Sequence, residues 1–154
     1  MLLNWQIKKF ELLTAHELYA IMQLRNEVFI LEQNCLYQDA DDRDQPSWHL
    51  LGINNEGKLM AYCRLLPAGI AFQEPSIGRV VTHADVRRVG AGKELLNEAI
   101  KNCKELFHNS HIRIGAQLYL LQFYKSFGFQ QQSEIYLEDG IEHVEMVLIS
   151  EIKE

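Results

Sequence analysis

A strand, a glycine-bearing loop and an amphipathic helix follow one another between residues 77 and 107, and this unit constrains the fold more than any other segment. Residues 77–82 include the β-branched side chains Ile77, Val80 and Val81, which suit a strand. Across residues 94–107 apolar side chains recur three and four positions apart, with charged and amide side chains between them. That spacing is typical of a helix with one face packed on a sheet. The sequence therefore predicts a sheet covered by this helix.

The loop of the unit reads Arg87-Arg88-Val89-Gly90-Ala91-Gly92-Lys93. Free N–H groups and the helix dipole favour an anion at a helix N-terminus, and glycine lets the backbone approach it closely. Glu94 stands where a P-loop needs Ser or Thr, and Leu95 stands where a dinucleotide fingerprint needs a third glycine. The remaining pattern, R-x-x-G-x-G, predicts a pyrophosphate site; the alternative is an ordinary turn with solvated arginines.

The composition is that of one soluble α/β domain. The 154 residues are 47% hydrophobic and 23% charged, and the net charge of −6 argues against general affinity for nucleic acid. Cys35, Cys63 and Cys103 have neither disulfide nor zinc spacing, so we expect no metal and a reducing, cytoplasmic setting. No export signal or membrane-spanning run is recognisable, and we expect no membrane partner.

The other patterns supply the order of elements. Thr14 and Glu17 form a capping box that begins a first helix, and Gly128 can end a helix over residues 118–127. Gly57 and Gly140 mark the turns of two hairpins. Strands are expected at residues 5–10, 50–53, 59–66, 77–82, 112–116, 129–137 and 141–149. This order predicts one domain over residues 1–154, with a core at about 8–150 and helices packed on a mixed sheet.

The first helix leads into a polar segment. Its apolar stripe places Arg25 on or beside the buried face. Residues 32–47 lose the helical pattern and contain Asp39, Asp41, Asp42 and Asp44. A charge-rich segment of this kind is usually solvated, so we expect a surface connection, although its field could also attract a cationic amine.

Two separated motifs in this order resemble the GCN5-related N-acetyltransferases (GNAT). One is the strand followed by R-x-x-G-x-G and the amphipathic helix, and the other is Gln122-Phe123-Tyr124-Lys125-Ser126-Phe127-Gly128-Phe129. Residues 25–33 and 115–117 resemble the small ElaA-like branch. The resemblance covers essentially the whole chain. It implies an α/β (α+β) fold with a mixed, mostly antiparallel sheet flanked by helices. Two parallel strands of that sheet would splay apart and hold acetyl-CoA between them.

The resemblance also implies roles on the donor side. Acetyl-CoA would be held by backbone groups of Val80, Val81 and Thr82, by the loop residues Arg87, Arg88, Val89, Gly90, Ala91, Gly92 and Lys93, and by Gln117. Tyr124 would be the general acid, since a phenol stays protonated at neutral pH and can protonate a departing thiolate. The alternative for Tyr124 is a place in an aromatic core with Phe123, Phe127 and Phe129.

The acceptor side stays open. The implied reaction is acetyl transfer to a primary amine of a small molecule or peptide. Arg25, Glu32 and Arg79 are the candidates for substrate contact, with Arg79 also able to pair with Glu32. Glu27, Glu32 and His83 are candidate bases, although water can serve instead. Alternative functions are a CoA-binding module that has lost catalysis and a structural protein, and the family resemblance allows a homodimer.

Overall fold

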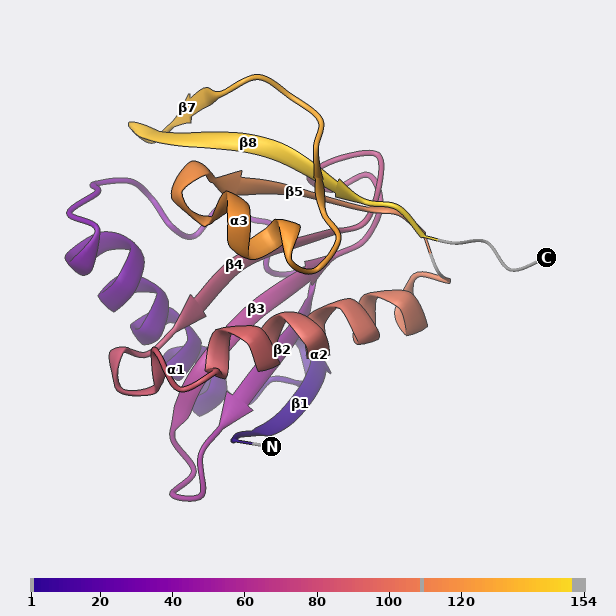
Figure 1. Ribbon diagram of the computed structural model, residues 1–154. Coiled ribbons are helices and arrows are strands. Elements are labelled where there is room, and N and C mark those ends of the chain that lie inside the picture. Colours follow the sequence, from indigo (N-terminus) through magenta and orange to yellow (C-terminus); the bar gives the residue numbers. More distant parts are fainter. Residues whose placement is uncertain (1, 109, 151–154) are drawn as a thin grey trace.

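The computed structural model describes residues 2–108 and 110–150; the ends of the predicted domain, residue 1 and residues 151–154, lie outside that part. The strands in it form two antiparallel sheets (Figure 1). The first sheet has the order β1 (Asn4–Lys9), β2 (Trp48–Ile53), β3 (Leu59–Leu66), β4 (Ser76–Thr82). In the second, β8 (Ile141–Leu148) pairs with β5 (Ile112–Gln117), β6 (Gln130–Gln131) and β7 (Tyr136–Glu138).

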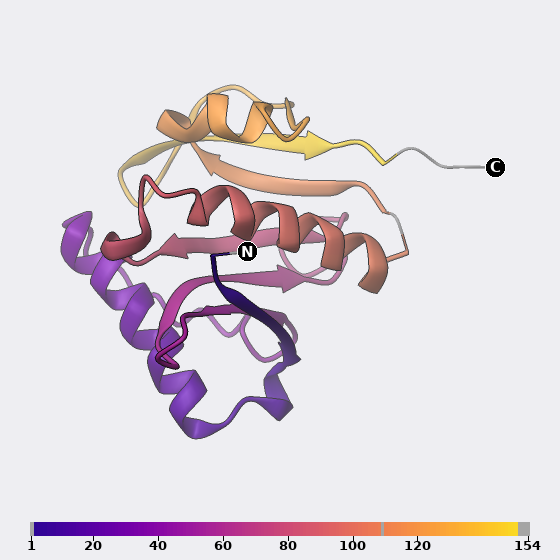
Figure 2. The same cartoon turned by 60° about the horizontal axis from the view of Figure 1, so that its bottom comes forward.

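Helices cover both faces of the first sheet. On one side lie α1 (Ala15–Arg25) and its π-helical continuation η2 (Asn26–Glu32), and on the other lies α2 (Ala91–Leu106). The short α3 (Leu121–Lys125) packs on β5 of the second sheet. Short 3₁₀ turns are η1 (Phe10–Leu12), η3 (Ala84–Val86) and η4 (Leu118–Leu120). Figures 1 and 2 show α1 and α2 on opposite sides of the sheet. Successive side chains of β3 accordingly pack into two hydrophobic cores. Cys63 packs in the core that contains the apolar residues of α2, and Tyr62 packs in the core that contains those of α1 and η2.

Several local predictions are confirmed. The capping box of Thr14 and Glu17 is complete, and both hairpins form at the predicted turns. Asp139 and Gly140 have φ of 50° and 77°, the positive values that a two-residue type I′ turn requires at both positions. Gly128 follows α3 with φ of 98°, in keeping with a left-handed helix end.

The prediction of one continuous strand over residues 129–137 is wrong. The structure divides this segment into the short β6 and β7, which pair separately with β8. Between them the Ser133 hydroxyl accepts from the Glu145 N–H at 2.8 Å, so a side chain replaces a strand carbonyl there.

The two sheets meet at β4 and β5. These strands run side by side in the same direction and diverge toward their C-terminal ends (Figures 1 and 2). They share no ladder in the described part of the chain; near their start the Arg113 N–H donates to the Pro75 carbonyl at 3.0 Å. The predicted splayed parallel pair is therefore present, and it divides the sheet into two antiparallel halves.

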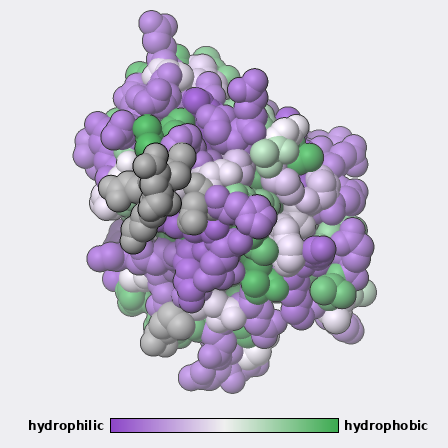
Figure 3. Space-filling model, turned by 90° about the vertical axis from the view of Figure 1, so that its right-hand side faces the viewer, coloured by the Kyte–Doolittle hydropathy of each residue, from purple (hydrophilic) through white to green (hydrophobic). Residues whose placement is uncertain are grey.

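The described residues contain no helix that is both long and apolar enough to cross a bilayer. The face in Figure 3 is mainly hydrophilic, and its apolar side chains lie in small separate areas. No broad apolar surface is present on that face.

Candidate active site

The divergence of β4 and β5 leaves an opening of about 1000 Å³. Its walls come from β4, the N-terminus of α2, η2 with the segment that follows it, α3, and the hairpin of β7 and β8. Of the predicted site residues, those that line it are Glu32, Arg79, Val80, Val81, Thr82, Arg87, Arg88, Gly92, Gln117 and Tyr124. Segments far apart in sequence thus converge on one cavity.

A β-bulge shapes the β4 wall. Tyr62 pairs with Val81 and Arg64 with Gly78, so Arg79 and Val80 together face the single residue Cys63. Arg79 takes the left-handed conformation, with φ of 49°. A bulge leaves a backbone group outside the ladder, so this part of β4 can present an N–H or C=O group to the opening.

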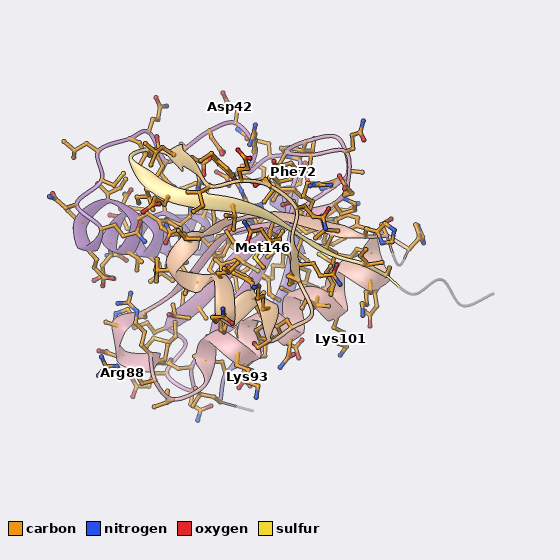
Figure 4. The ribbon with its side chains drawn as sticks, turned by 45° about the horizontal axis from the view of Figure 1, so that its top comes forward. Asp42, Phe72, Arg88, Lys93, Lys101 and Met146 are labelled. Carbon is orange, nitrogen blue, oxygen red and sulfur yellow. The ribbon has the colours of Figure 1, made fainter. Side chains whose placement is uncertain are left out.

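The loop before α2 forms the second wall. Gly90 caps the helix with φ of 93°, and no other group lies within 4 Å of the position a Cβ would take, so backbone conformation rather than space requires glycine. The first N–H groups of α2 have no partner inside the helix. Arg88 and Lys93 are exposed at this end of α2 (Figure 4). The loop thus offers free donors and positive charge to an anion.

Only some residues of the loop reach the cavity wall. Ala91 packs in the core and, like Val89, Gly90 and Lys93, is not part of the cavity wall. The Arg87 guanidinium donates to Glu32 Oε2 at 2.6 Å and to the Thr82 carbonyl at 2.9 Å. Arg87, rather than Arg79, is therefore the partner of Glu32.

Tyr124 lies on α3, against Phe123 and Phe129 with ring centroids 5.4 and 6.0 Å away. The residue is 6% exposed, it lines the opening, and its hydroxyl has no hydrogen-bond partner in the described part of the chain. Burial raises the pKa of the phenol, so the hydroxyl keeps its proton at neutral pH. Tyr124 is thus both packed in an aromatic cluster and available to the opening as a proton donor.

Gln117 ends β5, across the opening from η2. Its side-chain amide donates to Gln33 Oε1 at 3.4 Å, which links the second sheet to the segment after η2. Cys35 extends the link, because its thiol donates to the Asp139 carbonyl at 3.2 Å. These two contacts join the segment after η2 to the second sheet.

The acidic segment is only in part the solvated connection that we expected: Asp42 is exposed, whereas Asp39 and Asp44 are buried. It forms a network, buried except at Asp41 and Arg79, in which three aspartates neutralise three arginines: Asp39, Asp41, Asp44, Arg25, Arg64 and Arg79. Burial by itself raises the pKa of Asp44, but the hydrogen bonds and charges of Arg25 and Arg64 outweigh it and hold the pKa below 3.8. The segment folds inward because each buried carboxylate has a guanidinium partner.

Arg25 is a structural member of this network. Its side chain is fully buried, and its guanidinium donates to Asp39 Oδ2 and Asp44 Oδ1, each at 2.7 Å. Arg25 does not line the opening. The structure therefore places it behind the wall, where it positions the segment instead of contacting a substrate.

The three candidate bases differ in placement. Glu32 reaches the opening but is paired with Arg87. Glu27 and His83 do not line the opening; their side chains lie 3.9 Å apart. Within the described residues no group of three or more His, Cys, Asp or Glu side chains is arranged to hold a metal ion.

Sequence reasoning missed the contribution of the C-terminal hairpin. Tyr136, Glu138, His143 and Glu145 all line the opening. They lie on one face because His143 pairs with Tyr136 and with Gln117, and directly paired residues share a face. The alternation of residues 141, 143 and 145 was a visible signal, but it became informative only when the partner strands were known.

The fold is that of the acyl-CoA N-acyltransferases. The crystal structure of an acyl-CoA N-acyltransferase from Pseudomonas aeruginosa superposes with a TM-score of 0.89 at 38% identity, covering 94% of this chain and 98% of that one. Escherichia coli ElaA superposes with a TM-score of 0.88 at 37% identity, with the same coverage of 94% and 98%.

The family model for the acetyltransferase (GNAT) domain matches residues 16–150, so the chain belongs to the GNAT acetyltransferase family. A UPF0039 protein from Schizosaccharomyces pombe is 42% identical over 147 residues, which are 95% of this chain and 97% of that protein. The predicted family and its ElaA-like branch are thereby confirmed.

Proposed function

We propose that the protein transfers an acetyl group from acetyl-CoA to a primary amine, by direct attack of the amine on the thioester. The observation that carries the proposal is that the bulged β4, Gly92 in the first turn of α2 and Tyr124 all line one opening. Acetyl-CoA supplies an activated acyl group whose leaving thiolate benefits from a proton. Three unpaired cysteines suit a reducing, cytoplasmic setting.

The residues present fit this donor. A pyrophosphate needs several N–H donors and positive charge, which the start of α2 and Arg88 offer. The pantetheine arm needs an unpaired strand edge, and β4 has one on the side where β5 diverges. Val80, Val81 and Thr82 lie along that edge, so their backbone groups would orient the thioester beside the bulge.

Tyr124 would donate its proton to the sulfur as the C–S bond breaks. The raised pKa of Tyr124 keeps the phenol protonated beforehand. A backbone N–H at the bulge would stabilise the negative charge that develops on the thioester oxygen. Both groups are held by packed secondary structure, so they are oriented before the substrates bind.

The test is Tyr124→Phe, with Tyr19→Phe as the matched control because Tyr19 is 72% exposed on α1 and does not line the opening. With an amine found by screening polyamines, amino acids, aminoglycosides and short peptides, we expect Tyr124→Phe to lower kcat about 100-fold. The rise in melting temperature caused by acetyl-CoA should be retained, and the control should keep both properties. An unchanged kcat contradicts the role of Tyr124.

Two other outcomes decide between functions. A thermal shift with acetyl-CoA but no turnover of any amine would favour a CoA-binding module. Absence of any shift would leave only a structural role. Gly92→Trp, which fills the cavity wall beside Phe123, should abolish the shift if the donor site is placed correctly.

A further inference from the structure

His143 lines the opening at the end where β5 finishes with Gln117. It sits near the start of β8, directly opposite Gln117 of β5 and Tyr136 of β7. Its ring stacks on Tyr136 with a centroid distance of 5.9 Å, and the residue is 7% exposed. His143 is therefore held rigidly on the face that lines the opening, beside the end of the strand where β4 and β5 have diverged.

The hydrogen bonds of His143 fix which nitrogen is basic. Nδ1 lies 2.7 Å from the Ile141 carbonyl, which can only accept, so Nδ1 carries a hydrogen. In the neutral ring Nε2 then has the free lone pair. Nε2 lies 3.3 Å from Glu138 Oε2, so a proton that arrives at Nε2 is placed beside a carboxylate. Nε2 is thus the ring nitrogen that can take a proton from a bound amine.

The groups around His143 favour a cation. The titratable side chains that η4, the segment after η2 and the hairpin contribute to the opening are Tyr119, Cys35, Tyr37, Tyr136, Glu138 and Glu145. The turn adds Asp139. Glu145 is paired with Arg113 at 3.6 Å, whereas Glu138 has no arginine or lysine partner in the described part of the chain. The lining also contains Arg43, which is exposed, and Arg64, which is paired with Asp41 and Asp44. Arg79, on the opposite wall, is already paired with Asp39 and Asp41. A primary amine, which is an ammonium ion at neutral pH, is attracted to such a site but must lose a proton before it can attack.

We propose that His143 is the general base of the reaction and that Glu138 positions the acceptor ammonium and stabilises the imidazolium; this inference rests on the proposed function. Glu138 has a 61% exposed side chain, so it can turn to admit the amine. Nε2 takes one proton from the ammonium, and the nitrogen lone pair forms the C–N bond. The C–S bond breaks, its electron pair leaves with sulfur, and sulfur takes the Tyr124 proton. The nitrogen returns its surplus proton to the phenolate, and His143 releases its proton to solvent.

The test compares His143→Asn with the unsubstituted protein across pH. Asparagine can still donate to the Ile141 carbonyl but offers no base. With the amine turned over fastest in the screen of spermidine, lysine, kanamycin and a short peptide, we expect kcat/KM at pH 7 to fall about 100-fold. The deficit should shrink as the pH approaches 10, because more of the amine then arrives without its extra proton. His16→Asn, an exposed change on α1, should have no effect.

Glu138→Gln provides a second variant that changes only an exposed side chain. We expect it to lower kcat/KM at pH 7 about threefold to tenfold, with the same recovery at high pH. A loss in His143→Asn that is equal at all pH values, or no loss, overturns the role of His143 and leaves the proposed function standing. No turnover of any amine by the unsubstituted protein overturns both.

Discussion

Replacing Arg25 with methionine should destabilise the protein strongly, because it removes one charge from a balanced buried set. The fully buried guanidinium donates to the Asp39 carboxylate, the Asp44 carboxylate and the Asp39 carbonyl, at 2.7, 2.7 and 3.1 Å. Methionine fills similar apolar volume but leaves one negative charge without compensation. Breaking a buried pair in this way costs about 3–5 kcal/mol, a large part of the stability of an ordinary domain. The melting temperature should fall by about 6–20 °C.

The assay is urea denaturation at pH 7 followed by a thermal melt. The matched control is Arg43→Met, in the same segment but exposed and without an ion pair in the described part of the chain, which should change stability by less than about 0.5 kcal/mol. Adding Asp44→Asn to the Arg25 variant restores the charge balance. The double variant should therefore lose less free energy of unfolding than the sum of the losses in the two single variants. A loss below about 1 kcal/mol for Arg25→Met, or strictly additive losses, would refute the charge-balance reasoning.

The remaining predictions concern acid, thiols and one glycine. The pKa of Asp44 in the folded protein lies below 3.8, so the stability that this carboxylate contributes is present above that pH and is lost as the pH falls through the lower folded value. Circular dichroism should therefore show steep acid unfolding only below about pH 4. Unfolding at a higher pH that Asp44→Asn removes would contradict the network. Burial raises the pKa of Cys103 to about 12 and that of Cys63 well above its usual range, so a thiol reagent should modify Cys35 first in the folded protein; equal rates would show that the core opens readily. Gly90→Ala should cost about 1–2 kcal/mol in urea denaturation, because a Cβ at φ of 93° is strained even where space is free, and an unchanged midpoint would contradict that backbone conformation.

Local sequence patterns predicted the parts of the fold that depend on local physics. The amphipathic α2 follows from its apolar periodicity, and the turn of the last hairpin follows from Asp139-Gly140, because few other pairs adopt two positive φ angles. The convergence of Tyr124 and the α2 loop came from recognising two motifs in order. The roles of the individual donor residues stay predictions.

Long-range pairing explains what the sequence could not reveal. Asp39 and Asp44 resembled a solvated acidic segment because their partners are distant in the sequence: Arg25 lies on α1 and Arg64 on β3. No local period relates these residues, so only the packed structure brings them together. His143 was overlooked for the same reason, since its neighbours Gln117 and Tyr136 are set by strand register and not by spacing.

The buried network also sets the shape of the proposed donor site. Arg79 occupies the left-handed region within the β4 bulge, which costs a residue with a Cβ about 1–2 kcal/mol. Its guanidinium lies 2.9 Å from Asp39 Oδ1, 3.3 Å from Asp41 Oδ2 and 5.7 Å from the Tyr37 ring, and these contacts offset the strain. If the network were lost, the bulge would lose the contacts that hold it. Substitutions at Asp39 should therefore impair acetyl transfer without touching either substrate, because the segment that closes the core also fixes the strand edge on which the thioester would lie.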